Sequence, residues 1–172
     1  MKKLVALLLM VLFLGQSCIT DQKRYKETDI FEEFETQQGF VVLHLPPVLF
    51  KLVLNLSEEK NQFNTDLTDK IEVIKIIFFE ETKHTVSNQE VSQTLQQKAK
   101  DANYQLLTQI AQEGTNISIF IFEQDKIIHE ILFTALSEKD YFGVNVVGNF
   151  TREEVLKIYQ SINMQQVKSM GN

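Results

Sequence analysis

The chain has 172 residues, of which 44% are hydrophobic and 23% charged, and its formal net charge is −6. These values are typical of a folded domain, so they exclude a disordered chain, a collagen-like chain and a small disulfide-framework protein. The negative charge argues against a nucleic-acid binder, which needs a basic surface.

The first residues are typical of an export signal. Lys2 and Lys3 form a short basic region, and the apolar run at residues 4–14 follows it. A helix that spans a bilayer needs about 20 apolar residues, so this run is too short to remain as a membrane anchor. We predict that residues 1–17 are a signal peptide, with the small residues Gly15 and Ser17 near the cleavage point.

The chain has one cysteine, Cys18, and it directly follows this segment. The arrangement resembles a bacterial lipoprotein signal, in which the cysteine is lipidated and becomes the mature N-terminus. It departs from the usual motif because Leu14 lies four residues before the cysteine and Gln16 is bulky. We expect Cys18 to carry the lipid; ordinary secretion is the alternative. Because the chain is acidic, the lipid rather than attraction to anionic headgroups would be the membrane contact.

The remaining chain is predicted to hold one domain. Residues 18–28 are polar and are interpreted as the lipidated N-terminus and a tether, residues 29–162 as a single domain, and residues 163–172 as a polar tail. The domain would begin with a short helix that buries Ile30, Phe31 and Phe34. Asp29 would cap this helix and Gly39 would end it.

A buried strand, a helix and a second strand are expected next. The apolar run at residues 40–45 predicts the buried strand, and Pro46-Pro47 ends it and opens the helix. That helix would carry apolar residues at helical spacing: Val48, Leu49, Leu52, Val53 and Leu56. Residues 57–68 predict a loop with a short helical turn, and β-branched and aromatic residues predict a strand at 71–81.

The second half predicts a helix, a β-meander and a final helix. Ser87 and Glu90 match a capping box and start a helix that runs to about residue 101. Four strand-like runs with short turns between them follow, at residues 104–111, 116–123, 126–136 and 141–148, and they predict antiparallel hairpins. Thr151 and Glu154 form a second capping box before the last helix. Helices early and strands late indicate an α+β fold with a mostly antiparallel sheet and helices packed on one face.

Apolar side chains on both faces of one strand suggest an interaction surface. Ile117, Ile119 and Ile121 point to one face, while Phe120 and Phe122 point to the other. In the following strand, Ile128 is expected on the same face as Leu132, opposite Ile131. One face should be covered by helices, and the other needs a second layer, a ligand or a partner. One of the two rows is therefore the candidate interaction surface.

Several segments together resemble a known family. They are the Phe-rich first helix, the run IEVIKIIFF, the hairpin NISIFIFEQDKIIHEILF and the closing segment VNVVGNFTREEVLKI. The order is similar to lipoproteins of Bacteroidota that carry the domain of unknown function 4252, over about residues 28–162. Pro46-Pro47 and the Gln-rich helices depart from the family pattern. The resemblance implies a small exported lipoprotein of a Gram-negative envelope and offers no catalytic residues.

No local motif predicts a catalytic, cofactor-binding or metal-binding residue. His44 is expected in the core or at its rim, His84 at a solvated strand end, and His129 with Glu130 at an exposed cross-strand position. The spacing Glu81-x-x-His84 occurs in carboxylate-bridged metal sites, but only one copy is present. The acidic pairs do not converge as a calcium loop requires. Gly143 and Gly148 are interpreted as a bend or a close backbone contact, and Gly148-Asn149 as a strand-to-helix turn.

These observations favour a lipid-anchored, non-enzymatic interaction or binding module of the cell envelope. It would be anchored in the outer membrane of a Gram-negative bacterium and bind an envelope protein. One alternative is a carrier of an apolar small molecule. Another is a hydrolase whose acids and histidines come together only in the fold. An exposed apolar strip would favour the first hypothesis, an enclosed apolar cavity the carrier, and a cleft with histidines and acids the enzyme.

Overall fold

The computed structural model describes residues 25–56, 65–80, 86–112 and 114–161. The predicted signal peptide, Cys18, His84 and the polar tail at 163–172 lie outside the described residues. The described elements are η1 (Glu32–Phe34), β1 (Phe40–Leu45), α2 (Pro47–Leu56), α3 (Thr65–Thr68), β2 (Ile71–Glu80), α4 (Asn88–Asp101), β3 (Gln105–Gln112), β4 (Thr115–Gln124), β5 (Ile127–Leu136), β6 (Asp140–Phe150) and α5 (Arg152–Ser161).

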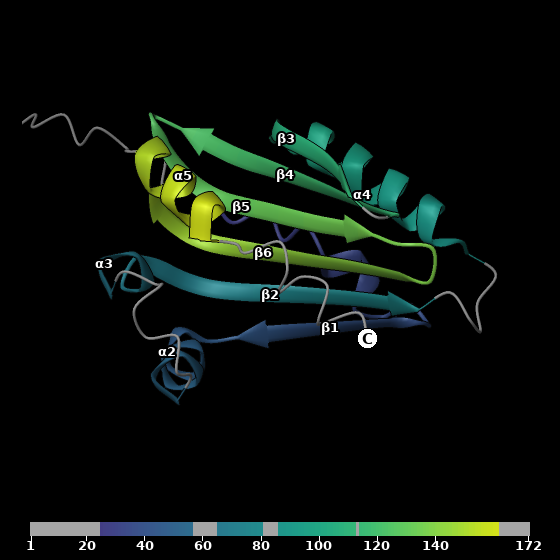
Figure 1. The fold of residues 1–172 in the computed structure, drawn as a ribbon, viewed down its shortest axis with the longest axis horizontal. Coiled ribbons are helices and arrows are strands. Elements are labelled where there is room, and N and C mark those ends of the chain that lie inside the picture. Colours follow the sequence, from purple (N-terminus) through teal and green to yellow (C-terminus); the bar gives the residue numbers. More distant parts are fainter. Residues whose placement is uncertain (1–24, 57–64, 81–85, 113, 162–172) are drawn as a thin grey trace, which may run out of the picture.

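Six strands form one antiparallel sheet in the order β1-β2-β6-β5-β4-β3 (Figure 1). The four C-terminal strands pair in sequence as a meander, and β2 pairs with the free side of β6. This confirms the predicted α+β fold and the C-terminal meander. The sheet leaves β1 and β3 as its two edge strands, with their outer backbone groups unpaired within the sheet.

The main core lies on the face covered by α4 and η1, called the α4 face. The predicted capping box of α4 is present, since Ser87 accepts a hydrogen bond from the Glu90 amide and Glu90 bonds back to Ser87. Val91, Leu95 and Ala99 of α4 pack with the predicted set Ile30, Phe31 and Phe34 against sheet residues of this face. Those sheet residues are Ile77, Phe79, Phe120, Leu132 and Tyr141.

A second core lies on the opposite face, called the α5 face. The predicted Thr151 capping box starts α5, with Glu154 bonding back to the Thr151 amide at 2.9 Å. Val155 of α5 packs in one cluster with Ile119, Ile121 and Ile131. Helices were predicted on one face of the sheet. α4 and η1 cover that face, and α5 partly covers the other.

Because both faces are covered at β4, the predicted interaction rows are not exposed. Ile117, Ile119, Ile121 and Phe120 are all buried, and Phe122 is half-buried. The expectation that one of these rows forms a surface is therefore wrong. β1 was predicted as a buried strand, and this is also wrong. It is an edge strand, and its Val41 and Leu43 are 54% and 46% exposed.

A β-bulge in β5 changes the facing of its first residues. The pairing of β5 with both β4 and β6 shifts between Ile128 and Glu130. A bulge inserts one extra residue, so the simple alternation of side chains breaks there. Ile128 consequently joins Ile131 in the α5-face cluster, instead of Leu132 as predicted. His129 was expected at an exposed cross-strand position, but it is only 9% exposed, and its neighbour Glu130 is fully buried.

The glycines and the first helix also differ in detail from the predictions. Gly148 and Asn149 continue β6 instead of forming a turn. A Cβ at Gly143 would lie 2.8 Å from the Ile77 side chain, which confirms a close contact. The first helix is a single 3₁₀ turn whose N-cap is Phe31, and Gly39 has a positive φ of 96° just before β1. Asp29 does not cap that helix; its carboxylate binds Lys75 instead.

Candidate functional site

The described chain begins with a segment that is fastened to the α4 face. Residues 25–28 belong to the predicted tether, yet three of their four side chains contact the sheet. Tyr25 and Thr28 bond to Glu130 of β5, and Glu27 forms an ion pair with Lys75 of β2. The folded domain therefore starts at least as early as Tyr25, which corrects the expected boundary at residue 29.

Glu130 is the centre of this attachment. Its Oε1 accepts hydrogen bonds from the Tyr25 hydroxyl and, at 2.8 Å, from the Thr28 amide. Its Oε2 accepts from the Tyr104 hydroxyl, from Thr28 Oγ1 at 3.0 Å and from Asn145 Nδ2 at 2.6 Å. A buried carboxylate needs such donors, because leaving a charge without partners in the protein interior is very costly.

The two tyrosines beside Glu130 are held in the protonated form. Burial is the largest cause that raises the pKa of Tyr25, and the Glu130 carboxylate raises it further by accepting its proton in a hydrogen bond. Burial also raises the pKa of Tyr104, followed by charge repulsion from Glu130. At neutral pH both hydroxyls therefore act as hydrogen-bond donors to Glu130.

Lys75 forms a second charged attachment beside the first. It pairs with Asn145 across β2 and β6, and its side chain is buried. Its Nζ binds the carboxylates of Glu27 and of Asp29, the latter at 2.7 Å. Burial alone would lower the pKa of Lys75, but the bonds to Asp29 and Glu27 outweigh it and the pKa is raised.

The hydrogen bonds around Glu130 hold the N-terminal segment on the sheet and leave few groups free to react. The cluster consists of Tyr25, Thr28, Tyr104, Glu130 and Asn145. A carboxylate has about four acceptor positions, and five donors already surround Glu130. His129 stacks on Tyr25 with ring centroids 4.2 Å apart. Its Nδ1 is buried without a hydrogen-bond partner, so no carboxylate or hydroxyl orients this ring nitrogen as a base.

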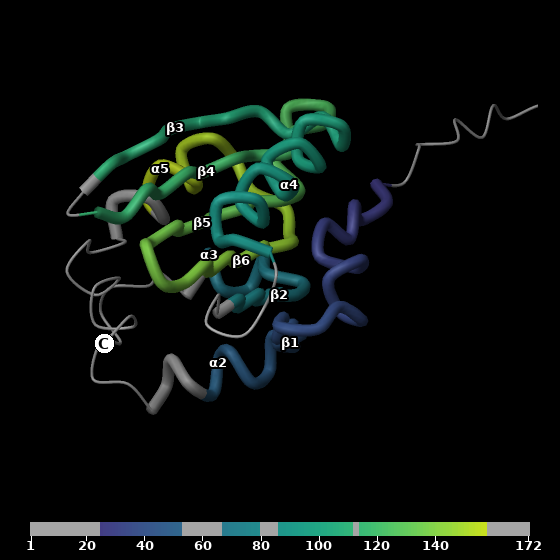
Figure 2. The backbone as a smooth tube through the Cα atoms, turned by 90° about the vertical axis from the view of Figure 1, so that its right-hand side faces the viewer, coloured from purple at the N-terminus to yellow at the C-terminus, as the bar shows by residue number. Residues whose placement is uncertain are grey.

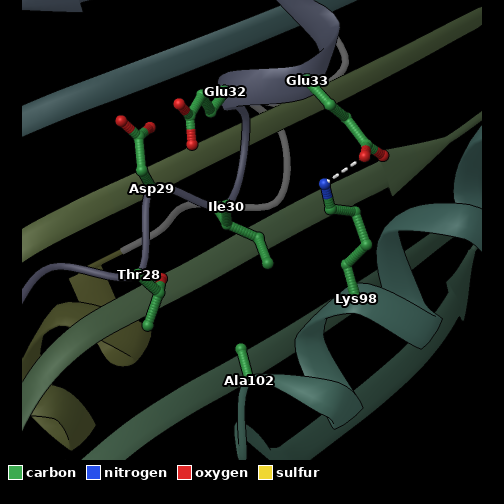
Figure 3. Close-up of a pocket in the computed structure, with 7 residues that line it drawn as sticks. All are labelled: Thr28, Asp29, Ile30, Glu32, Glu33, Lys98 and Ala102. Carbon is green, nitrogen blue, oxygen red and sulfur yellow. Dashed lines mark ion pairs between the residues drawn. The ribbon is translucent and has the colours of Figure 1, made fainter.

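A pocket of about 430 Å³ opens beside the cluster, between the N-terminal segment and α4. Figure 3 shows Lys98 reaching from α4 towards Glu33, and the two form an ion pair at 2.6 Å. The lining is mixed in character: Thr28, Asp29, Ile30, Glu32, Glu33, Lys98 and Ala102. Three carboxylates face one ammonium group there, so the pocket does not resemble an apolar carrier cavity.

The fold does not bring the described histidines together. His44 is exposed on β1 and bonds to Glu35 at 2.7 Å, whereas His129 is buried on β5. His44 is therefore an exposed edge residue and not a core residue. Among the described residues, no group of three His, Cys, Asp or Glu side chains could hold a metal ion. In the same part of the chain, no helix is long and apolar enough to cross a membrane.

Exposed apolar side chains lie next to one another along β1 and β2. Val41 and Leu43 of β1 point to the α5 face, and Phe78 of β2 pairs directly with Val41. All three side chains are exposed, and we call them the apolar edge. The neighbouring Phe79 points to the other face and is buried in the main core.

The residues that build the buried cluster were missed by the sequence reasoning. Lys75, Glu130 and Asn145 each interrupt an otherwise apolar strand sequence. Such isolated polar residues inside strand cores are the signal that could have indicated a buried polar network. A polar residue in a strand buried on both faces must find polar partners.

The fold and this site define a small α+β domain with a sheet of six antiparallel strands, a fastened N-terminal segment and an apolar edge. Residues 34–158 match the family described as "Domain of unknown function (DUF4252)", and the chain belongs to this family. Comparison with the curated proteins and with the solved structures gave no match.

Proposed function

We propose that this protein is a lipid-anchored, non-enzymatic interaction module of the envelope of a Gram-negative bacterium of the Bacteroidota. Its lipid would attach it to the outer membrane, and its apolar edge would bind an envelope protein. The observation that carries the proposal is the exposure of Val41, Leu43 and Phe78 on adjacent strands.

The apolar edge supports partner binding for two physical reasons. Adjacent exposed apolar side chains form a contact patch, whereas isolated ones are ordinary surface residues. β1 is also an edge strand, so its outer N–H and C=O groups are available to an added strand. An incoming strand would gain backbone hydrogen bonds from β1 and apolar contacts from Leu43 and Val41.

The N-terminal attachment supports anchoring at Cys18. Six residues lie between Cys18 and Tyr25, where the chain meets the sheet. A lipid at Cys18 would therefore hold the domain close to the membrane, and the bonds at Glu130 would transmit that attachment to the sheet. The carrier and hydrolase alternatives gain no comparable support, because the described pocket has a mixed polar lining and the described histidines lie apart.

The anchor is tested on the mature protein recovered from a bacterial host. We expect the mature chain to begin at Cys18 and to carry the added mass of a lipid, because the apolar run before it is too short for a permanent anchor. Mass spectrometry of the N-terminal peptide measures both properties. Cleavage at another residue, or an unmodified Cys18, would refute the anchor.

The binding surface is tested by introducing a charge into the apolar edge. Leu43→Lys should abolish recovery of a co-purifying envelope partner and change the free energy of unfolding by less than about 0.5 kcal/mol, since the site is exposed. Leu106→Lys is the matched control, because Leu106 is exposed on the opposite edge strand β3. Ile119→Lys should cost several kcal/mol, because it buries an unpaired charge. Equal partner recovery with Leu43→Lys and Leu106→Lys would contradict the proposal.

A further inference from the structure

Helix α2 exposes apolar side chains instead of burying them. Its sequence, PVLFKLVLNL, contains one charged residue, Lys51, and no acid. Val48, Leu49 and Leu52 are 70%, 46% and 53% exposed. By contrast, α4 buries its apolar residues Val91, Leu95 and Ala99 against the sheet. A helix of this composition at a surface is suited to an apolar environment and not to water.

The position of α2 sets it apart from the other helices. Figure 2 shows α2 beside β1, away from α4 and α5. Figure 1 places it with α3 and α5 at one end of the sheet. Lys51 is paired with Asp69 at 2.5 Å, so the only charge of the helix is partly neutralised. The exposed side chains of α2 thus form an apolar projection at one end of the domain.

The register of the sheet places the N-terminal attachment at the same end. Leu45, Ile74, Val146 and Ile131 form one row of paired residues across β1, β2, β6 and β5. β1 and β5 run in opposite directions, so moving forward from Leu45 to Pro47 and backward from Ile131 to His129 leads to the same end. Three strand spacings, or about 14 Å, separate the two positions. Tyr25, stacked on His129, therefore lies level with the start of α2.

The length of chain before Tyr25 limits its distance from the lipid. This step rests on the proposed attachment of a lipid at Cys18. The seven residue-to-residue steps from Cys18 to Tyr25 span at most about 25 Å, even when fully extended. The end of the sheet that carries Tyr25 must then stay within that distance of the membrane surface. Because α2 projects from this same end, it lies within reach of the bilayer.

We propose that α2 inserts Val48, Leu49 and Leu52 into the interface of the membrane that holds the lipid. A lipid surface fits these residues because the contact needs apolar area and no matching charge. The acidic chain argues against attraction to anionic headgroups, so binding depends on apolar insertion and changes little with salt.

The absence of tryptophan from the sequence allows a direct test. Leu52→Trp places a single fluorescent reporter on α2, and Leu107→Trp is the matched control on exposed β3. The mature protein with each change is reconstituted into neutral phosphatidylcholine vesicles with brominated acyl chains, which quench only tryptophan at acyl depth. We expect at least twofold quenching for Leu52→Trp, little for Leu107→Trp, and the same result at high salt.

The outcomes separate this inference from the proposed anchor. Mass spectrometry reports whether Cys18 is lipidated, while quenching reports whether α2 enters the bilayer. A lipidated protein in which Leu52→Trp stays as unquenched as Leu107→Trp overturns the role of α2 and leaves the anchor intact. A blue shift of Leu52→Trp that rises with protein concentration and does not need vesicles assigns α2 to self-association and also overturns it. Quenching without a lipid at Cys18 supports α2 insertion and refutes the anchor. Val48→Trp repeats the measurement from a second position, and circular dichroism verifies each fold.

Discussion

Replacing Glu130 by alanine should lower the free energy of unfolding by about 3–5 kcal/mol, a large part of the total for a single domain. The change removes the acceptor for the Tyr25 and Tyr104 hydroxyls and for Asn145, and leaves these buried donors without their partner. Each unsatisfied buried donor costs about 1–3 kcal/mol, and the costs do not add fully. Chemical denaturation followed by circular dichroism measures the loss.

The matched control is Glu138→Ala, because Glu138 is an exposed glutamate in the turn between β5 and β6. It should change stability by less than about 0.5 kcal/mol. Tyr104→Phe should cost less in the Glu130→Ala background than in the wild type, since its bond to Glu130 is then already lost. A Glu130→Ala protein as stable as Glu138→Ala would show that the buried carboxylate does not hold the N-terminal segment.

Local patterns were sufficient to predict the second half of the fold. The strands of the meander are joined by short turns, so each pairs with its sequence neighbour without information from distant segments. The helices α4 and α5 begin at the predicted capping boxes at Ser87 and Thr151. A capping box can be predicted because its hydrogen bonds join residues only three positions apart. Sequence patterns of this kind describe local structure and sequential pairing well.

The buried cluster could not be predicted because its parts are far apart in the chain. Tyr25 and Glu130 are separated by 105 positions and meet only in the folded sheet, where Glu130 lies on the α4 face, two residues before Leu132 in β5. The polar residues 25–28 were interpreted as a tether for the same reason, since their buried partners were not recognised.

The predicted exposure of the sheet failed because exposure depends on strand order. An apolar run such as residues 40–45 is compatible with a central strand or an edge strand, and only the pairing of β1 with β2 alone decides between them. The rows on β4 are buried because β4 is an inner strand covered by α4 on one face and by Val155 of α5 on the other. The exposed apolar side chains that could bind a partner therefore lie on the apolar edge and not on β4.

Raising the pH above 10 should unfold the protein cooperatively. Burial raises the pKa of Tyr104 and of Tyr141 above the ordinary value of 10.0, so the folded state keeps their protons while the unfolded state releases them. Their stabilising contribution is complete below pH 10 and is lost as the pH rises towards the folded-state pKa. In that range each tyrosine lowers the free energy of unfolding by about 1.4 kcal/mol per pH unit, or about 5 kcal/mol for both at pH 12.

Two other groups contribute with the same sign. The pKa of Tyr25 is raised by burial and by Glu130, and the pKa of Lys75 is raised by its carboxylate partners. Both therefore lose stabilising free energy as the pH increases past their unfolded-state values. These two groups fasten the N-terminal segment, so alkaline conditions weaken that segment together with the core.

Absorbance at 295 nm and circular dichroism measured together test this expectation. The signal of the buried phenolates should appear only in the pH range where secondary structure is lost, because ionisation is coupled to unfolding. Tyr141→Phe removes one of the buried groups, so its unfolding midpoint should lie at a higher pH than that of the wild type, after correction for any stability change at pH 7. If all tyrosines titrate near pH 10 while the circular dichroism is unchanged, Tyr25 and Tyr104 do not donate to a buried Glu130. The attachment of the N-terminal segment would then have to rest on Lys75 and on the apolar contacts of Ile30 and Phe31.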